Sequence, residues 1–261
     1  FKKLDWALEI AAKQLNERFN FQKTALKKQF PLLMGALWLD SEKIGENESI
    51  ESVINHGTLG IGFIGLAECL IALIGKHHGE SAEAQELGLR IVNFMRSKVN
   101  EFCETYKHNY SVLATPAEGL AGRFTRGDKK KFGIIPGITD KDYYTNSNHI
   151  PVYYKISAFK KLSLEAPYHA LTNAGHISYV ELDGDPTQNL DAFEKIVQHM
   201  AKVGIGYGSI NHPVDRDPVC GFVGVIGDSC PRCGRSEGHA ISEEKLKELR
   251  RLYPGMPAFK G

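Results

Sequence analysis

The sequence contains no hydrophobic run long enough to cross a membrane, no signal peptide, no low-complexity tract and no internal repeat. The formal net charge is only +1, so the overall charge favours binding neither to nucleic acid nor to a membrane surface. These absences argue against a membrane protein, a solenoid and a protein that binds polyelectrolytes through bulk charge. We therefore expect a cytoplasmic globular protein.

The 261 residues are 42% hydrophobic and 24% charged, which is enough to build one large core or two smaller ones. The first residue is Phe1 rather than methionine, and it opens directly onto a helical pattern. The last eight residues, P-G-M-P-A-F-K-G, contain no closing element. We expect a piece of a longer polypeptide.

Cysteine is scarce, with five residues in the chain, yet Cys220, Cys230 and Cys233 lie close together in sequence. The pattern P-x-C-G occurs twice, at 218–221 and at 231–234. This repetition is typical of two zinc knuckles, in which backbone N–H groups point at a thiolate and glycine permits the tight turn. The hydrophobic residues between the turns predict a short strand.

A closed structural zinc site needs four ligands, and three cysteines supply only three. The fourth ligand would be Asp217, His212 or a distant residue. A disulfide between two of the cysteines and a set of three free thiols are the alternatives. A redox C-x-x-C usually opens a helix, whereas G-R-S-E-G follows Cys233, which suits a knuckle better. We expect Cys69 and Cys103 to be packing residues.

Helical and strand periodicities alternate from about residue 105 onward, which indicates an α/β protein. Pro167 is expected to break the helix that contains it. Helices are predicted over residues 4–28, 81–106, 157–173, 190–203 and 242–252, and strands over 110–114, 175–184 and 204–210.

Residues 55–75 contain glycine at positions 57, 60, 62 and 65 among apolar residues. We interpret them as a buried turn that enters a buried helix. A glycine-rich turn at a helix start can hold phosphate, although the spacing is that of neither a P-loop nor a dinucleotide fingerprint.

Thr115, Pro116 and Glu118 have the order of a helix start, with Thr115 as N-cap and Glu118 in the first turn, and capping alone explains both. Residues 126–142 form a basic segment that we expect to be a surface loop. In 144–154, Asn146, Ser147, Asn148 and His149 precede an apolar, aromatic run. Such a cluster marks either a pocket wall or turn chemistry.

Several of these stretches together resemble the anaerobic (class III) ribonucleotide reductases, which are glycyl-radical enzymes. The resemblance covers nearly the whole chain, and the motifs occur in family order. The matching stretches are H-G-T-L-G-I-G-F-I-G-L-A-E (56–68), A-T-P-A-E-G-L-A-G-R-F (114–124), Y-T-N-S-N-H-I-P-V (144–152), E-A-P-Y-H-A-L-T-N-A-G-H-I-S-Y-V-E-L-D-G (165–184) and the cysteine region 211–235.

The resemblance implies a fold and a division of the chain. Residues 1–210 would form the C-terminal half of a ten-stranded α/β barrel. Residues 211–240 would form a zinc-binding knuckle segment, and residues 241–261 a C-terminal helix and the start of the radical loop.

The resemblance also implies an activity, the reduction of ribonucleoside triphosphates to deoxyribonucleotides for DNA replication. In this family a glycyl radical oxidises a cysteine inside the barrel, and the thiyl radical abstracts the ribose 3′ hydrogen. An iron–sulfur activase that uses S-adenosylmethionine installs the radical, and formate or a thiol is the reductant. The implied partners are the activase, the remainder of the reductase chain and a second copy in a homodimer.

The sequence departs from the family in three ways. The glycyl-radical motif is absent, and the thiyl cysteine is expected upstream of Phe1, so we expect this chain to be unable to turn over alone. Asp217 stands where many relatives have a zinc cysteine. The metal ligands are therefore predicted as Cys220, Cys230, Cys233 and Asp217.

The predicted substrate site combines the glycine-rich stretch, the helix start and the polar cluster. Its residues are His56, Gly57, Thr58, Thr115, Glu118, Ser147 and His149. Two other functions stay open at this point. One is a zinc-stabilised scaffold or partner-binding fragment of a split reductase, and the other is a different glycyl-radical enzyme, against which the zinc segment argues.

Overall fold

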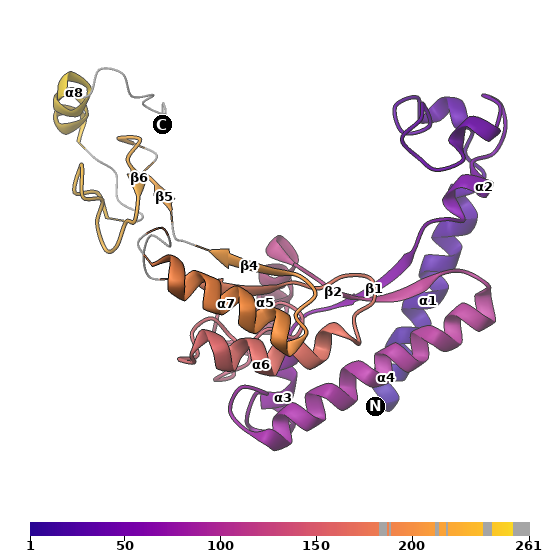
Figure 1. The fold of residues 1–261 in the computed structure, drawn as a ribbon, viewed down its shortest axis with the longest axis horizontal. Helices are drawn as coiled ribbons and strands as arrows, with labels where there is room; N and C mark the ends of the chain where they lie inside the picture. The colour runs from indigo at the N-terminus through magenta and orange to yellow at the C-terminus, as the bar shows by residue number, and fades with distance from the viewer. Residues whose placement is uncertain (183–186, 188, 212–213, 218, 237–241, 253–261) are drawn as a thin grey trace. The chain divides into compact units, whose positions relative to one another are not determined.

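A computed structural model describes residues 1–182, 187, 189–211, 214–217, 219–236 and 242–252 (Figure 1). The chain divides into two compact units. One comprises Phe1–Ser178 with Ile196–Gly208, and the other comprises Tyr179–Lys195 with Ser209–Gly261. Helices and strands are mixed throughout, as the alternating periodicity predicts. No helix among the described residues is both long enough and apolar enough to span a bilayer.

The core of the first unit surrounds a pair of parallel strands, β1 (Leu59–Phe63) and β2 (Tyr110–Ala114), in which Ile61 lies opposite Val112. The long helix α4 (Ala82–Tyr106) packs on β2, and α1 (Lys2–Gln22) packs on α4 and β1 (Figure 1). Their apolar faces bury one cluster: Leu8, Ala12, Ile61, Met95, Val99, Phe102, Tyr110 and Val112.

Most helices lie close to their predicted ranges. The hydroxyl of Ser81 caps α4 by accepting a hydrogen bond from the Ala84 N–H at 3.2 Å. α1 ends at Gln22, earlier than the predicted residue 28, because the chain turns there and Leu26 forms a bridge with Ser49. The remaining short helices before β1 are η1 (Lys27–Gln29), η2 (Ser41–Lys43) and α2 (Glu51–Ile54).

The prediction of a turn through the glycine-rich stretch is wrong, because residues 59–63 form strand β1 and α3 (Leu66–Ile74) begins only after it. In the sequence L-G-I-G-F, large apolar residues alternate with glycine, which is the period of a strand. Ile61 is buried in the core. A Cβ at Gly62 would overlap the hydroxyl of Thr115, so the glycine lets that side chain lie across the strand.

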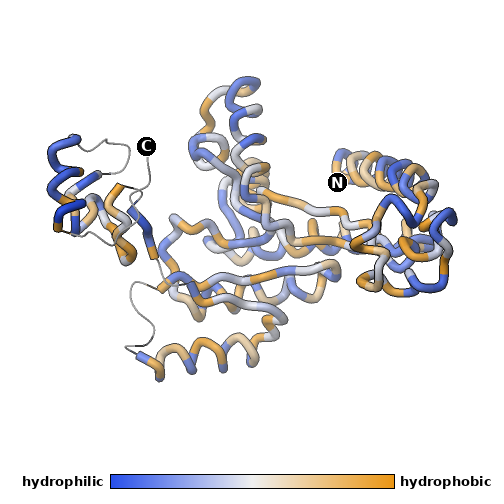
Figure 2. Tube along the Cα trace, turned by 90° about the horizontal axis from the view of Figure 1, so that it is seen from above, coloured by the Kyte–Doolittle hydropathy of each residue, from blue (hydrophilic) through white to orange (hydrophobic). Residues whose placement is uncertain are grey.

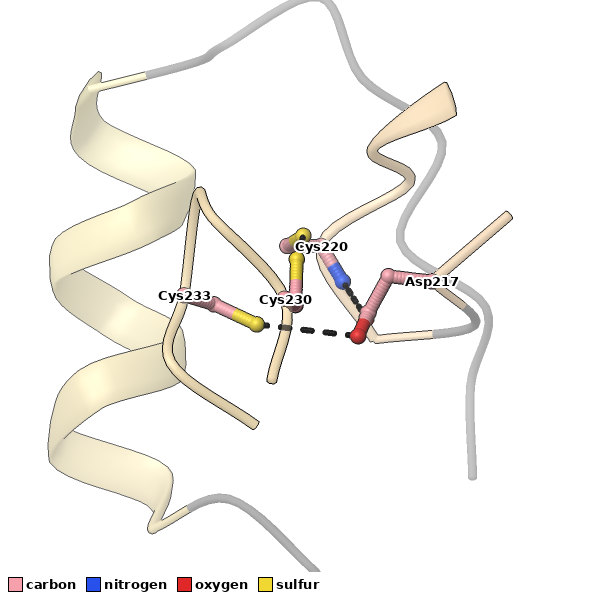
Figure 3. Close-up of side chains that lie close together, drawn as sticks. All are labelled: Asp217, Cys220, Cys230 and Cys233. Atoms are coloured by element: carbon pink, nitrogen blue, oxygen red, sulfur yellow. Dashed lines mark hydrogen bonds between the residues drawn. The ribbon is translucent and has the colours of Figure 1, made fainter. Parts of the chain in front are cut away.

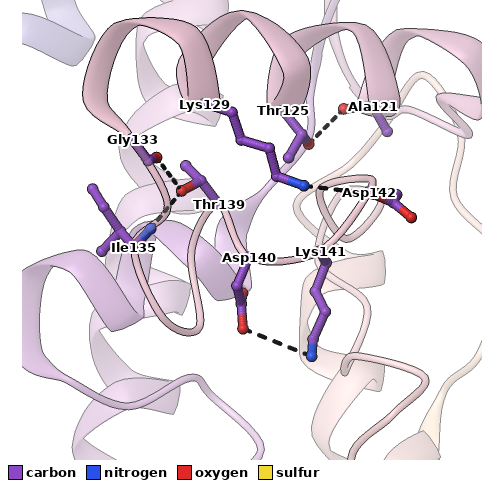
Figure 4. Close-up of polar contacts among 9 residues, drawn as sticks. All are labelled: Ala121, Thr125, Lys129, Gly133, Ile135, Thr139, Asp140, Lys141 and Asp142. Atoms are coloured by element: carbon purple, nitrogen blue, oxygen red, sulfur yellow. Dashed lines mark hydrogen bonds and ion pairs between the residues drawn. The ribbon is translucent and has the colours of Figure 1, made fainter.

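The basic segment is also not a loop throughout, since α5 (Glu118–Phe132) extends to residue 132. Lys129, Lys130 and Lys131 occupy its last turn, where cations interact favourably with the helix dipole. After α5 the chain forms a loop over residues 133–139 that Thr139 stabilises. Its hydroxyl accepts the Ile135 N–H at 2.7 Å and donates to the Gly133 carbonyl at 2.8 Å (Figure 4).

Pro167 does not break its helix, contrary to expectation, but lies within α6 (Ala158–His169). It stands in the last turn, with only Tyr168 and His169 after it, so the lost hydrogen bond costs the helix little length. The side chain of Ser157 caps the other end by accepting the Lys160 N–H at 3.3 Å.

The rest of the chain contains two more pairs of strands. β3 (Ser178–Glu181) pairs with β4 (Gly208–Asn211), and β5 (Asp215–Arg216) pairs antiparallel with β6 (Val223–Gly224). Figure 2 shows hydrophobic and hydrophilic residues alternating along α7 (Leu190–Val203), whereas α8 (Glu243–Leu252) is largely hydrophilic. α8 buries Leu249 against the cysteine region, and the Ser242 hydroxyl accepts the Lys245 N–H at 3.3 Å, as a cap does.

We predict that Gly62→Ala destabilises the protein by about 1–3 kcal/mol, because the new methyl group collides with Thr115. The matched control is Gly60→Ala on the same strand, where a Cβ meets nothing within 4 Å. The control should be neutral or slightly stabilising. Urea denaturation curves measure both, and equal midpoints for the two variants would contradict the close approach.

Candidate functional site

Parallel pairing places the carboxyl ends of β1 and β2 at the same edge of the strand pair, where α/β proteins commonly bind ligands. Thr115 follows β2 directly, and residues 64–66 lead from β1 into α3. The polar cluster of the sequence reaches the same edge, because Asn146 forms an antiparallel bridge with Ile64. Three of the predicted stretches are therefore brought together here.

Residues 145–150, which we call the polar segment, are attached to the start of α3. The Gly65 N–H donates to the Thr145 carbonyl at 2.7 Å, and the Leu66 N–H donates to the Ser147 carbonyl at 3.3 Å. One carboxylate oxygen of Glu68 accepts both the N–H of Thr145, at 2.9 Å, and its hydroxyl, at 2.7 Å. The polar segment therefore occupies the first amides of α3, which cannot serve a phosphate there.

The other end of the polar segment is attached to α6 through Glu165, a fully buried carboxylate. Its Oε1 accepts the Ile150 N–H at 2.9 Å and lies 2.8 Å from Lys161 Nζ and 3.5 Å from His149 Nδ1. Burial alone would raise the pKa of Glu165, but the imidazole of His149 and the ammonium group of Lys161 lower it to about 2. Glu165 is thus ionised at neutral pH.

The predicted residues Ser147 and His149 lie in the middle of this segment, and both are buried. Ser147 has a positive φ of 39°, which is unfavourable for a residue with a side chain. Within the part of the chain that the structure describes, its hydroxyl has no hydrogen-bond partner. The neighbouring Asn148 carbonyl accepts a hydrogen bond of 2.9 Å from His78 Nε2. Burial lowers the pKa of His78 to about 4, so this imidazole is neutral.

Thr115 is not the N-cap that the sequence suggests. α5 begins at Glu118 with Ala117 as N-cap, and the amide oxygen of Asn146 accepts the Ala117 N–H at 3.1 Å. The residue before a proline favours an extended backbone, which keeps Thr115 out of the helix start. The polar segment therefore also holds the first turn of α5.

A cavity of about 430 Å³ opens at this first turn. Glu118 and Gly119 line it, and so do Asn146, which belongs to the polar cluster singled out in the sequence, and Arg126; neither of these two is among the predicted substrate residues. Arg126 is two turns beyond Glu118 on α5, so a helical wheel would have placed both on nearby faces. The guanidinium of Arg126 and the positive end of the α5 dipole favour an anion here, and they act beside the carboxylates of Glu118 and Asp142, which also line the cavity.

His56, Gly57 and Thr58 lie at the opposite edge, before the amino end of β1. The Thr58 hydroxyl accepts a hydrogen bond of 2.9 Å from Asn109, and His56 Nε2 lies 3.1 Å from an Asp40 carboxylate oxygen. These three residues line a separate cavity of about 400 Å³. The structure does not bring them to the other predicted substrate residues.

The four predicted metal ligands converge in the second unit. The ligand atoms of Asp217, Cys220, Cys230 and Cys233 all lie within 4.8 Å of one another, and all four residues are buried (Figure 3). The Sγ atoms of Cys220 and Cys230 are 3.6 Å apart, which is too far for a disulfide, and all five cysteines are free thiols. His212, the alternative ligand, lies outside the described residues.

The turns around Asp217 and Cys230 have the same hydrogen-bond pattern, residue for residue. The Asp217 N–H donates to the carbonyl of Phe222, five residues later, and the Asp217 carbonyl accepts the N–H of Gly221, four residues later. Cys230 makes the same two bonds, with Arg235 and Gly234.

Both glycines that close these turns have a positive φ, 67° at Gly221 and 73° at Gly234. One oxygen of the Asp217 carboxylate accepts the N–H groups of Val219 and Cys220. The Cys230 sulfur accepts the N–H groups at the equivalent positions, Arg232 and Cys233. Asp217 therefore occupies the position that a knuckle cysteine would hold.

The electrostatics of the cluster suit a cation. Burial would raise the pKa of Asp217, but the N–H groups of Cys220 and Val219 and the guanidinium of Arg235 lower it to about 2. Burial raises the pKa of the Cys220 thiol to about 12. Cys230 has a lowered pKa, because the N–H groups of Cys233 and Arg232 outweigh its burial.

Zinc binds cysteine as the thiolate, so an ion bound here would replace the thiol protons and neutralise the repulsion among three thiolates and a carboxylate. The donor set, three sulfurs and one oxygen, is one that zinc accepts. The residues present therefore fit a tetrahedral zinc ion.

Comparison with solved structures identifies the fold. The chain superposes on an anaerobic ribonucleotide reductase with a TM-score of 0.63 at 18% identity, covering all of this chain and 40% of that one. It also superposes on the Thermotoga maritima anaerobic ribonucleotide reductase with dATP bound in the specificity site, with a TM-score of 0.62 at 18% identity, covering 90% of this chain and 37% of that one. The fold is therefore of the anaerobic ribonucleotide reductase class.

Sequence comparison identifies the family. Residues 1–251 match the family model described as anaerobic ribonucleoside-triphosphate reductase. Proteins of that name from Escherichia coli and phage T4 are 32% and 34% identical to this chain, over 93% and 84% of its length. The chain belongs to the anaerobic ribonucleoside-triphosphate reductase family, as the sequence motifs predict. It spans about a third of the length of these relatives, 35% of each.

The low pKa of Glu165 predicts a pH dependence of stability. Because the folded pKa of about 2 is below the ordinary 4.5, the ionised carboxylate stabilises the fold above pH 4.5, and this contribution is lost as pH falls towards 2. Glu165→Gln should reduce the free energy of unfolding at pH 7 by about 3 kcal/mol at most. Denaturation at several pH values should show the difference from wild type closing between pH 4.5 and 2. A difference that is constant with pH would contradict the assignment.

Proposed function

We propose that this chain forms part of the catalytic subunit of an anaerobic reductase that converts ribonucleoside triphosphates to deoxyribonucleotides. The observation that carries the proposal is the family match over residues 1–251, combined with a polar edge at the carboxyl ends of parallel strands. Parallel pairing of β1 and β2 is consistent with one half of a ten-stranded barrel. We assign the radical-bearing residues to the rest of the reductase, an activase as the protein that installs the radical, and formate or a thiol as the reductant.

The triphosphate would bind at the first turn of α5. Helix geometry leaves the N–H groups of Glu118, Gly119 and Leu120 without acceptors inside the helix, and they form the positive end of its dipole. Arg126 lines the same cavity and adds a permanent positive charge. Backbone amides and a guanidinium together are suited to phosphate oxygens. Glu118 would take part through its N–H, since its carboxylate would repel the phosphate.

Ser147 and His149 would contact the ribose or the base from the polar segment. The buried Ser147 hydroxyl is free to donate to or accept from a sugar hydroxyl. The segment lies beside the α5 cavity because Asn146 belongs to both. We leave His56, Gly57 and Thr58 out of the proposed substrate site because they lie at the opposite edge.

We further propose that Asp217, Cys220, Cys230 and Cys233 hold a structural zinc ion. Such an ion ties the two pseudo-equivalent turns together and provides the cation that their charges require. The zinc-stabilised scaffold, the competing proposal, explains this cluster but gives no role to the α5 cavity and the polar segment.

We predict about one zinc ion per chain in the purified protein. Cys230→Ser should lose the metal and unfold the turns of the cysteine region, whereas Asp217→Cys should bind zinc more tightly, because a fourth thiolate completes the tetrahedral sulfur set. Metal analysis and chelator competition measure both effects. Cys69→Ser is the matched control, since Cys69 lies on α3 outside the cluster, and it should leave the zinc content unchanged. Full zinc retention in Cys230→Ser would refute the site.

We predict that Arg126→Ala weakens ribonucleoside triphosphate binding by about tenfold or more, the scale of a lost charge-assisted hydrogen bond. Binding of the corresponding nucleoside, which carries no phosphate, should change little. Lys130→Ala is the control, because Lys130 is an exposed cation on the same helix that does not line the cavity. Equilibrium binding to the full-length reductase measures the affinities. Equal losses for Arg126→Ala and Lys130→Ala would indicate general charge attraction instead of a site.

A further inference from the structure

Two buried carboxylates, Glu68 and Glu165, have no role in the proposed contacts with substrate. They come from different helices, α3 and α6, and each accepts a backbone N–H from one end of the polar segment. Glu68 is 4% exposed and Glu165 is fully buried. Placing a carboxylate in such a position is costly unless its hydrogen bonds compensate for lost hydration.

The hydrogen bonds fix both ends of the segment. At one end, a single oxygen of Glu68 accepts the N–H and the hydroxyl of Thr145, which sets both the backbone and the side chain of that residue. At the other end, Oε1 of Glu165 accepts the Ile150 N–H and is itself held by Lys161. Between these two anchors Ser147 keeps its positive φ, a conformation that persists only when the surrounding structure enforces it.

The position of the segment determines the position of the α5 helix start. Asn146 directly follows Thr145, bridges to Ile64 and accepts the Ala117 N–H with its side chain. Ala117 is the N-cap of α5, and its N–H has the Asn146 side chain as its acceptor. A shift of Thr145 would therefore move Asn146 and release the first turn of α5.

We propose that Glu68 and Glu165 are positioning residues that hold the polar segment from both ends and thereby, through Asn146, set the first turn of α5 for a phosphate-bearing substrate. This inference rests on the proposed function for the identity of the ligand, but the mechanical link from Glu68 to Ala117 does not. A purely packing role would be served equally well by apolar residues, which carry no desolvation cost. Carboxylates instead fix specific donors in specific directions.

The test uses the full-length reductase. For the first anchor it compares two substitutions at Glu68 with one control substitution elsewhere. Glu68→Ala removes the oxygen that accepts both hydrogen bonds from Thr145, while Glu68→Gln keeps one oxygen that can accept both. Glu83→Ala is the control, because Glu83 is an exposed carboxylate in the first turn of α4. For the other anchor, Glu165→Leu is combined with Lys161→Leu, so that no unpaired buried charge remains to unfold the protein.

Two measurements are made on each variant. Hydrogen exchange followed by mass spectrometry reports the protection of peptides that cover residues 113–121 and 144–151. Equilibrium binding compares a ribonucleoside triphosphate with its nucleoside. In Glu68→Ala and in the double variant we expect faster exchange in both peptides. We also expect about tenfold weaker binding of the triphosphate, since small misplacements of a binding group are costly. The nucleoside should lose less affinity, because it meets only Ser147 and His149 of the segment and not the first turn of α5. Glu68→Gln should restore most of both properties, and Glu83→Ala should match wild type.

The outcomes separate this inference from the proposed function. Unchanged exchange in the 113–121 peptide of Glu68→Ala would overturn the positioning role, whatever the binding data show. An equal loss of triphosphate and nucleoside affinity would overturn it as well, because the effect would not be directed at the phosphate end. If exchange responds as expected but the wild-type protein binds no ribonucleoside triphosphate, the proposed function fails while the link from Glu68 to α5 stands.

Discussion

Both candidate sites depend on the same physical requirement, that a buried negative charge must be satisfied by donors fixed in place. One oxygen of Glu68 accepts from Thr145, one oxygen of Glu165 accepts from Ile150 and lies beside Lys161, and Asp217 accepts from two backbone N–H groups and Arg235. The second oxygens of Glu68 and Glu165 have no partner among the described residues, so the first oxygens carry the compensation. In each case at least one of the donors belongs to a chain segment without regular structure, so the carboxylate helps to order that segment. The irregular segments at these sites are therefore defined by electrostatics, while the helices and strands around them are defined by apolar burial.

The regular elements could be predicted from the sequence because their signals are local. The strand 110–114 and the helix 190–203 match the structure at both ends, since an unbroken apolar periodicity marks each. The predictions fail for two kinds of reason, local and distant. α5 has Ala117 as N-cap instead of Thr115, and the Ala117 N–H is accepted by Asn146, which is 31 residues from Thr115 and which no local pattern links to this helix start. In L-G-I-G-F two local signals compete: glycine favours a turn, and the alternation with large apolar residues favours the strand that forms.

The two candidate sites differ in how many of their residues can be predicted from the sequence. The four residues predicted as metal ligands lie together in the structure, because tight turns keep side chains and their backbone donors within a few residues of one another. The candidate substrate edge is assembled from four stretches spread over residues 64–165, so the sequence indicates some of its residues and not those that connect them. Arg126, Glu68 and Glu165 were overlooked for this reason. Each lies on a helix, where charged residues are common, and only its contact with a distant segment distinguishes it.

Parallel strand pairing explains why the predicted substrate residues divide into two groups. Residues that precede β1 and β2 must lie at one edge, and residues that follow them must lie at the other, five residues of strand away. Thr58 and Asn109 therefore meet at the amino edge, where they satisfy each other. Thr115 and the polar segment meet at the carboxyl edge. Among the described residues the Ser147 hydroxyl has no hydrogen-bond partner there, and helix geometry leaves the first amides of α5 without acceptors inside the helix. The difference between the edges is thus one of unsatisfied donors, and a ligand rich in acceptor oxygens gains most at the carboxyl edge.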